Sequence, residues 1–139
     1  MEKTTLTLKE IEAALEASWA ADTCSPDDLE RAGWSPANPA WGHCDVTALL
    51  LNDVFGGDLM VGKVFAGDQQ QGYHSWNRLD SGVEIDLTRS QFQAGQRIVG
   101  AKVVKRPLDR RPRRHDEYLL LRKRIEVHLG HFPPPAGYV

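Results

Sequence analysis

The sequence predicts an α+β domain in which N-terminal helices and a central helix pack on a small antiparallel sheet. Two observations carry this prediction. Apolar residues recur at helical spacing in the first 55 residues, whereas β-branched and alternating runs bounded by glycine dominate between residues 59 and 104. A further helical pattern follows near the C-terminus, so helices and strands are segregated rather than alternating, as is typical of α+β domains.

The helices are predicted from capping residues, the spacing of apolar residues and glycine stops. Thr7 and Glu10 match the capping-box pattern, and Ser25 followed by Pro26 is typical of a helix start. The apolar residues of the central helix indicate burial on several sides. Helices are expected over residues 7–20, 26–32, 44 or 45 to 55, and 116–129, with an extended proline-rich tail at 131–139.

The strands are predicted from apolar alternation between turn residues. They are expected over residues 59–66, 73–79, 83–87 and 97–104. The polar residues 67–72, rich in glutamine and glycine, are expected to form an exposed loop.

The loop Asp80-Ser81-Gly82 predicts the pairing of the strands on either side of it. If Gly82 adopts the left-handed conformation in a three-residue loop, paired residue numbers sum to 162. His74 and Asp86 are then diagonal neighbours on one face of the hairpin, about 7–8 Å apart at Cα. A two-residue loop would place them on opposite faces.

Length and composition predict a single domain over residues 1–139. The chain is 41% hydrophobic and 26% charged, with two cysteines, Cys24 and Cys44, that form neither a disulfide framework nor a metal-finger pattern. The first residues lack the pattern of a signal peptide, and no apolar run approaches the roughly 18–20 residues of a membrane span. We therefore expect a cytoplasmic protein with free thiols and no membrane partner.

Charge is unevenly distributed. Residues 1–60 hold eleven acidic and three basic side chains, whereas residues 61–139 hold eight acidic and fourteen basic ones, concentrated between Lys102 and Arg114. One interpretation is a site for an anionic polymer; the other is a solvated connection that pairs with the acidic half. No nucleic-acid motif or interleaved aromatic residues accompany the stretch, so nucleic acid is not expected as a partner.

Cys44 is the strongest candidate for chemistry. It lies where an irregular, proline-rich stretch becomes a helix, and the free N–H groups of a helix start favour a thiolate. His74 and Asp86 follow in the order base and orienting group. The three residues predict a catalytic triad in a cysteine-dependent acyl-transfer enzyme, a hydrolase or acyltransferase, with a peptide or small molecule as its substrate.

Weaker candidates surround this triad. Asn38 or His43 would add an oxyanion donor to the Cys44 N–H, Trp76 would shield the imidazole or contact substrate, and Arg89 would bind an anionic group or pair with the acidic half. His43, Cys44, His74 and Asp86 are also competent zinc ligands, but no pair has a characteristic ligand spacing. No metal or other cofactor is expected.

A noncatalytic interpretation of the same residues remains open. Cys44 at the start of a buried helix is also typical of a small hydrophobic residue, and His74 and Asp86 also suit structural roles. A noncatalytic binding module with the same fold would bury the thiol, whereas an enzyme needs an accessible and acidic one. Cys24 is expected in a polar loop, as a free thiol that is either on the surface or half-buried, or as a resolving thiol.

Five segments resemble the YunG-like family of small, largely uncharacterised bacterial proteins. The resemblance spans roughly residues 15–95 and is carried by residues 38–39, 42–49, 55–57, 74–79 and 84–92, of which the last, Glu-Ile-Asp-Leu-Thr-Arg-Ser-Gln-Phe, is the most specific. In that pattern the residue before the cysteine is usually glutamine, where this chain has His43.

The order Cys, His on a strand and Asp on the next strand more distantly resembles the papain-like and transglutaminase-like superfamily. This resemblance implies a nucleophile at the start of a helix packed on an antiparallel sheet that carries the other two residues. It implies hydrolysis or transfer at an amide or thioester bond and names no substrate.

Overall fold

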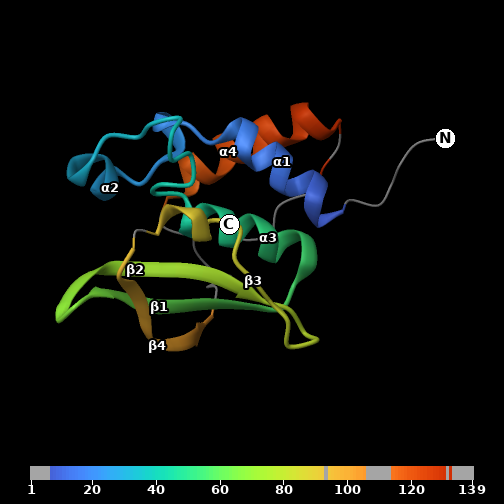
Figure 1. Ribbon diagram of the computed structural model, residues 1–139. Coiled ribbons are helices and arrows are strands. Elements are labelled where there is room, and N and C mark those ends of the chain that lie inside the picture. The colour runs from blue at the N-terminus through green and yellow to red at the C-terminus, as the bar shows by residue number, and fades with distance from the viewer. Residues whose placement is uncertain (1–6, 93, 106–113, 131, 133–139) are drawn as a thin grey trace.

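The computed structural model describes residues 7–92, 94–105, 114–130 and 132, and within them it has three layers (Figure 1). A four-stranded antiparallel sheet forms one side, helix α3 (Cys44–Phe55) lies on it, and helices α1 (Leu8–Ser18) and α4 (His115–Leu129) cover α3. The short helix α2 (Pro26–Arg31) lies beyond the start of α3. The predicted α+β class, with its central helix on a small antiparallel sheet, is confirmed.

The helix ends follow the local signals. The Thr7 hydroxyl accepts from the Glu10 N–H, and the Glu10 carboxylate accepts from the Thr7 N–H, so the expected capping box forms. Helix α3 begins at Cys44 and ends at Phe55, as predicted, where Gly56 adopts φ 69°. The single-turn helix η1 (Ala21–Thr23) between α1 and α2 was not predicted.

The sheet has the order β3-β2-β1-β4. Its strands are β1 (Asp58–Ala66), β2 (Gln69–Arg78), β3 (Glu84–Ile85) and β4 (Gln96–Val104), with a short 3₁₀ turn, η2 (Arg89–Gln91), between the last two. Asn77 pairs with Ile85 and Arg78 with Glu84, so the predicted sum of 162 is confirmed. Gly82 closes the loop at φ 92°, where a glycine has little steric cost.

Two expectations about the sheet are wrong. The segment 67–72 is not a loop: Gly67 and Asp68 alone turn the chain, and Gln69 and Gln70 already pair with β1. Their polar side chains remain exposed while their backbones join the ladder, so composition was a poor guide there. The strand expected over 83–87 has only two residues, because Asp86 leaves the ladder and its carboxylate accepts from the Thr88 N–H.

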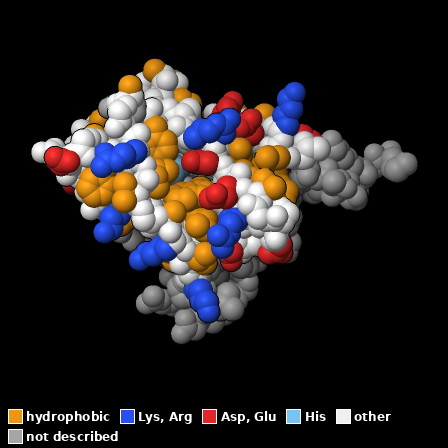
Figure 2. All heavy atoms as spheres, turned by 60° about the horizontal axis from the view of Figure 1, so that its bottom comes forward, with side chains coloured by type: hydrophobic (Ala, Val, Ile, Leu, Met, Phe, Trp, Pro, Cys, Tyr) orange, Lys and Arg blue, Asp and Glu red, His pale blue; other side chains and the backbone are white. Residues whose placement is uncertain are grey.

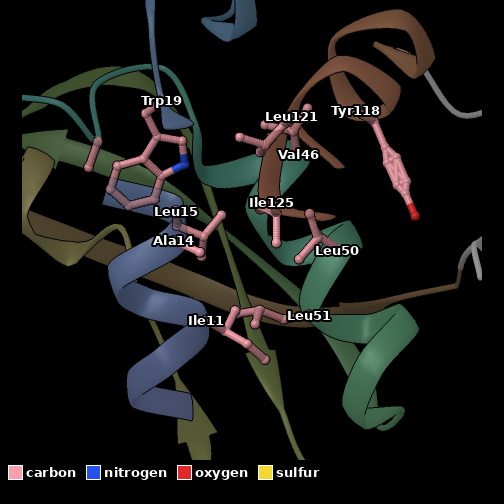
Figure 3. Packing of buried hydrophobic residues seen from close by; sticks show 11 residues of the cluster. Ile11, Ala14, Leu15, Trp19, Val46, Leu50, Leu51, Tyr118, Leu121 and Ile125 are labelled. Carbon is pink, nitrogen blue, oxygen red and sulfur yellow. The ribbon is translucent and has the colours of Figure 1, made fainter. Parts of the chain in front are cut away.

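The core lies between α1, α3 and α4 (Figure 3). Its largest fully buried aliphatic side chains come from all three helices: Ile11, Leu15, Leu50, Leu51, Leu121 and Ile125. On the other side of α3, the buried Asn77 amide of β2 donates to the Ala48 carbonyl at 2.9 Å. Helix α3 is therefore held by apolar packing on one side and by the sheet on the other, which positions its first residue, Cys44.

Strand β4 forms the edge of the sheet beside β1. Its apolar side chains are 37% to 43% exposed at Ile98, Val99, Val103 and Val104. Figure 2, which turns the sheet side toward the viewer, shows hydrophobic side chains gathered among Lys and Arg on this part of the surface. Beneath them, Gly62 of β1 has no room for a side chain, because a Cβ there would lie 2.3 Å from Ile98 and 3.3 Å from Trp76.

The turn before α3 is tightly packed. Gly42 has φ 74°, and a Cβ at this position would lie 2.3 Å from the Cys24 sulfur. Cys24 itself is buried, with its thiol 3.3 Å from the Trp41 carbonyl, so it is a packing residue and not the half-exposed loop thiol that was expected. Burial raises the pKa of the Cys24 thiol to about 11, which keeps it neutral.

Arg114 ties this turn to α4. Its side chain is 5% exposed and donates to the Gly42 carbonyl, to the Thr23 carbonyl at 2.5 Å, to the Asp45 carboxylate and to Glu117. The residue has φ 70°, a left-handed conformation that costs a non-glycine residue about 1–2 kcal/mol. The contacts of its guanidinium group offset this cost and hold the start of α3 from the outside.

His43 holds the same turn from the inside. Its ring is fully buried, with Nδ1 2.8 Å from the Trp41 carbonyl and Nε2 2.7 Å from the Thr23 hydroxyl. A carbonyl only accepts, so Nδ1 carries a proton, while the Thr23 hydroxyl lies within hydrogen-bond distance of both Nε2 and the Ala20 carbonyl. Burial lowers the pKa of His43 to about 4. The imidazole is therefore neutral and structural.

The Gly42→Ala variant tests the packing of the turn. We expect it to lower the free energy of unfolding by clearly more than Gly82→Ala, which also places alanine at positive φ but has nothing within 4 Å of its Cβ. The control substitution should cost about 1 kcal/mol through backbone strain alone. Urea unfolding of both variants measures the difference, and equal losses would show that the contact with Cys24 is easily relaxed.

His43 predicts a loss of stability in acid. The unfolded chain protonates this residue near its ordinary pKa of 6.5, whereas the folded chain does so only near 4. Its contribution is therefore complete above pH 6.5 and is lost as the pH falls toward 4, by about 3 kcal/mol. Urea unfolding across this range should show a steeper loss for the parent protein than for His43→Asn. If the free energy of unfolding depends on pH in the same way in both proteins, His43 is not a buried neutral imidazole in the folded state.

Candidate active site

His74 and Asp86 form the most clearly built part of the site. His74 Nε2 lies 2.6 Å from Asp86 Oδ2, and the imidazole is 1% exposed. The other carboxylate oxygen of Asp86 accepts from the backbone N–H and the hydroxyl of Thr88. Because a carboxylate only accepts, Nε2 carries the proton of the neutral ring. The predicted diagonal placement on one face of the hairpin thus brings these two side chains into direct contact.

Two aromatic side chains enclose the imidazole. Trp76 stacks on it with ring centroids 5.8 Å apart, and Phe92 meets it edge-on at 4.5 Å. The Trp76 indole donates to Glu84 at 2.6 Å, which fixes its own orientation. Of the two roles expected for Trp76, shielding of the imidazole describes the geometry. The enclosure leaves His74 few ways to turn, so its Nδ1 has a defined direction.

Gln91 occupies that direction, and sequence reasoning gave this residue no role. Its amide nitrogen lies 3.2 Å from His74 Nδ1, and its carbonyl oxygen accepts from the Gly42 N–H at 3.4 Å. The amide nitrogen only donates, so Nδ1 holds the lone pair and acts as the acceptor. Gln91 belongs to the specific string 84–92, and membership of that string was the one signal that could have identified it.

Cys44 lies at the first position of α3, as expected, but its thiol is not acidic. Burial raises the pKa of Cys44 to about 12, and the neighbouring Asp45 carboxylate adds to the rise, whereas the backbone N–H of Ser75 opposes it. The expected thiolate at the helix start is therefore wrong for this structure. Desolvation of the sulfur outweighs the influence of the helix N-terminus.

Cys44 and His74 approach β2 from different sides. Asn77 faces α3, so by strand alternation Ser75 does as well, whereas His74 and Trp76 point to the opposite face. The described hydrogen bonds of the His74 ring go to Asp86 and Gln91, and none joins it to the Cys44 sulfur. The structure thus brings base and orienting group together and leaves the nucleophile beside them without a hydrogen bond to the base.

A cavity of about 640 Å³ connects these groups. Cys44, His74, Gln91 and Phe92 all line it, and the exposed ring of Tyr73 stands at its wall. This volume lies within the roughly 300–1,000 Å³ of small-molecule sites. Two members of the candidate triad, Cys44 and His74, therefore face a space that a substrate or ligand can enter.

The weaker candidates lie elsewhere. Both ring nitrogens of His43 are engaged by Thr23 and Trp41, and Asn38 is not among the described residues that line the cavity. Arg89 is exposed and donates to the Asp86 carbonyl at 2.8 Å, so it supports the turn that carries the carboxylate. Neither oxyanion candidate gains support from these positions.

The basic stretch is only partly described, because residues 106–113 lie outside the described residues. Its last member, Arg114, is buried and paired with Asp45, and farther along α4 Arg124 pairs with Asp22 at 2.5 Å. These pairs join the basic and acidic halves of the chain. In the described part, no helix has the length and apolarity needed to cross a membrane, and no cluster of three His, Cys, Asp or Glu side chains suits a metal ion.

Comparisons with known proteins agree with the family resemblance. The family model described as YunG protein matches residues 7–130. An uncharacterised protein, YunG of Bacillus subtilis (strain 168), is 31% identical over 87 residues, which are 63% of this chain and 64% of that protein. The chain thus spans less than two thirds of the length of this relative. No solved structure matches the chain significantly. On the extent of the family match, the chain belongs to the YunG protein family.

Proposed function

We propose that this protein is a cysteine-dependent hydrolase or acyltransferase in which Cys44 is the nucleophile, His74 the general base and Asp86 the group that orients the base. The observation that carries the proposal is the His74–Asp86 hydrogen bond of 2.6 Å, enclosed by aromatic rings at the wall of a cavity that Cys44 also lines. An imidazole that is oriented by a carboxylate and lines the same cavity as a thiol supports this assignment. The central helix on an antiparallel sheet supports a papain-like or transglutaminase-like core.

The raised pKa of Cys44 defines the resting state in this proposal. The thiol is neutral at rest, and the imidazole presents the lone pair of Nδ1, to which the Gln91 amide nitrogen donates. As the sulfur attacks the carbonyl carbon, its proton passes to His74 Nδ1. That proton then moves to the leaving nitrogen or sulfur, the bond to the leaving group breaks, and an acyl thioester on Cys44 remains. Water or another nucleophile takes the acyl group and returns a proton to the sulfur through His74. Gln91 must leave Nδ1 before the first transfer.

A second candidate is a noncatalytic binding module with the same cavity. Two observations favour it: the thiol is desolvated with a pKa of about 12, and the lone pair of His74 is already bound by Gln91. In such a module the His74–Asp86 pair would serve only to hold η2 against β2. The two candidates differ in whether the reactivity of Cys44 depends on His74.

The His74→Ala variant separates the candidates. In a Cys24→Ser background at pH 7, we expect it to slow alkylation of Cys44 by iodoacetamide about tenfold or more, because it removes the proton acceptor. Mass spectrometry of Cys44 over time measures the rate, and His128→Ala in the remote helix α4 is the matched control. If all three proteins react equally slowly, the triad is excluded and the binding module is favoured.

Asp86→Asn tests the orienting group. The amide cannot stabilise an imidazolium as a carboxylate does, so it weakens the base while the enclosing rings keep the imidazole in place. We expect the same alkylation rate to fall by about tenfold or more, with unchanged circular dichroism. Thr88→Val is the control, because it removes only one of the hydrogen bonds to Asp86. A rate in Asp86→Asn equal to that of the control would contradict the assigned role.

A further inference from the structure

The carboxamide of Gln91 is held between two groups of opposite hydrogen-bonding character. On one side the Gly42 backbone N–H, two residues before the nucleophile, donates to its oxygen at 3.4 Å. On the other side His74 Nδ1, the nitrogen that the proposed mechanism uses, accepts from its nitrogen at 3.2 Å. Gln91 ends η2 and lines the cavity, so the amide group lies inside the proposed site.

These two groups specify the chemistry of whatever lies between them. The Gly42 N–H needs an acceptor, and the lone pair of neutral His74 needs a donor. An O=C–N–H unit offers both on neighbouring atoms. An ester or thioester offers only acceptors, and so does a carboxylate, so each of these would leave Nδ1 of the buried imidazole without a hydrogen-bond donor. The space between the Gly42 N–H and His74 Nδ1 is therefore complementary to an amide group.

We propose that the Gln91 carboxamide is an internal placeholder for the amide group of the substrate, so that the site takes an amide and not an ester or thioester. The inference rests on the proposed function and narrows its substrate class. A substrate amide displaces Gln91, takes the Gly42 N–H on its oxygen and turns its N–H toward His74. When the sulfur attacks, this N–H turns away so that Nδ1 takes the thiol proton, and the same ring nitrogen then protonates the leaving nitrogen beside it.

The residues that line the cavity also suit a ligand that carries amide groups. Gln70, Gln71 and Gln96 line it together with Gln91, and the Gln96 amide donates to the Gln71 side-chain oxygen at 2.7 Å. Such amide groups offer paired donors and acceptors to an extended amide-bearing ligand. The charged groups nearby are already engaged in part, with Arg114 on Asp45 and Arg31 3.7 Å from Asp28.

The test removes the Gln91 carboxamide and measures which small molecules bind in its place. Substituting Gln91→Ala removes the atoms that acetamide would replace, and Cys44→Ala in the same protein excludes any covalent reaction. We titrate this variant with acetamide, methyl acetate, S-methyl thioacetate and acetate, and follow the Gly42 amide and the His74 ring by NMR. Acetamide should bind at least about tenfold more tightly than the other three. The matched control is Gln96→Ala with Cys44→Ala, which opens the same cavity away from His74 and should show no such preference.

Two results would overturn the proposal: equal binding of acetamide and the esters, or the same preference in the Gln96→Ala control. The thiol is absent, so an unreactive Cys44 would defeat the proposed function without affecting this outcome. Should Gln91→Ala not fold, the side-chain amide signals of Gln91 in the Cys44→Ala protein provide a second measurement. Acetamide, and not methyl acetate, should then move Gln91 away from His74, and an unchanged Gln91 signal would contradict the inference.

Discussion

The burial of helix α3 on both sides is the constraint on which the rest of the structure depends. Leu50 and Leu51 pack against α1 and α4, while the Asn77 amide binds the opposite side of the helix to β2. A helix held in this way cannot slide or turn without exposing apolar surface or leaving a buried amide unpaired. The position of its first residue is therefore set by the whole core. The turn that precedes it needs only Gly42 and the buried His43 and Arg114 to complete the placement.

The same burial decides the chemistry of the thiol. A helix N-terminus stabilises an anion by about 0.3–1 kcal/mol. Burial is the first cause of the raised Cys44 pKa and Asp45 is the second. Desolvation therefore outweighs the influence of the helix N-terminus on the thiol. In the proposed reaction, a thiol in this position depends on a base that removes its proton, and the hydrogen-bonded His74–Asp86 pair is the candidate for that base.

Local signals in the sequence were enough for much of the fold. Glycine stops and the capping box determined helix ends within a few residues, and Gly82 determined the hairpin register and with it the meeting of His74 and Asp86. The missed features depend on contacts between distant residues. Gln91 lies 49 residues from Gly42, and Arg114 lies 69 from Asp45. No periodicity records such pairs, and a glutamine or an arginine in a polar stretch resembles any solvated side chain.

The long span between Arg114 and the turn it holds has a consequence for how the molecule is made. During synthesis the chain emerges from its N-terminus, so α3 and the β1–β2 hairpin leave the ribosome before residue 114 does. Until α4 docks, the Thr23 and Gly42 carbonyls lack their guanidinium partner, and the core lacks Tyr118, Leu121 and Ile125. The cavity around Cys44 is therefore completed only after α4 has been synthesised, when this high-contact-order pairing closes. A nascent chain that ends before α4 would carry Cys44, His74 and Asp86 without the contacts of Arg114 that hold the turn before Cys44.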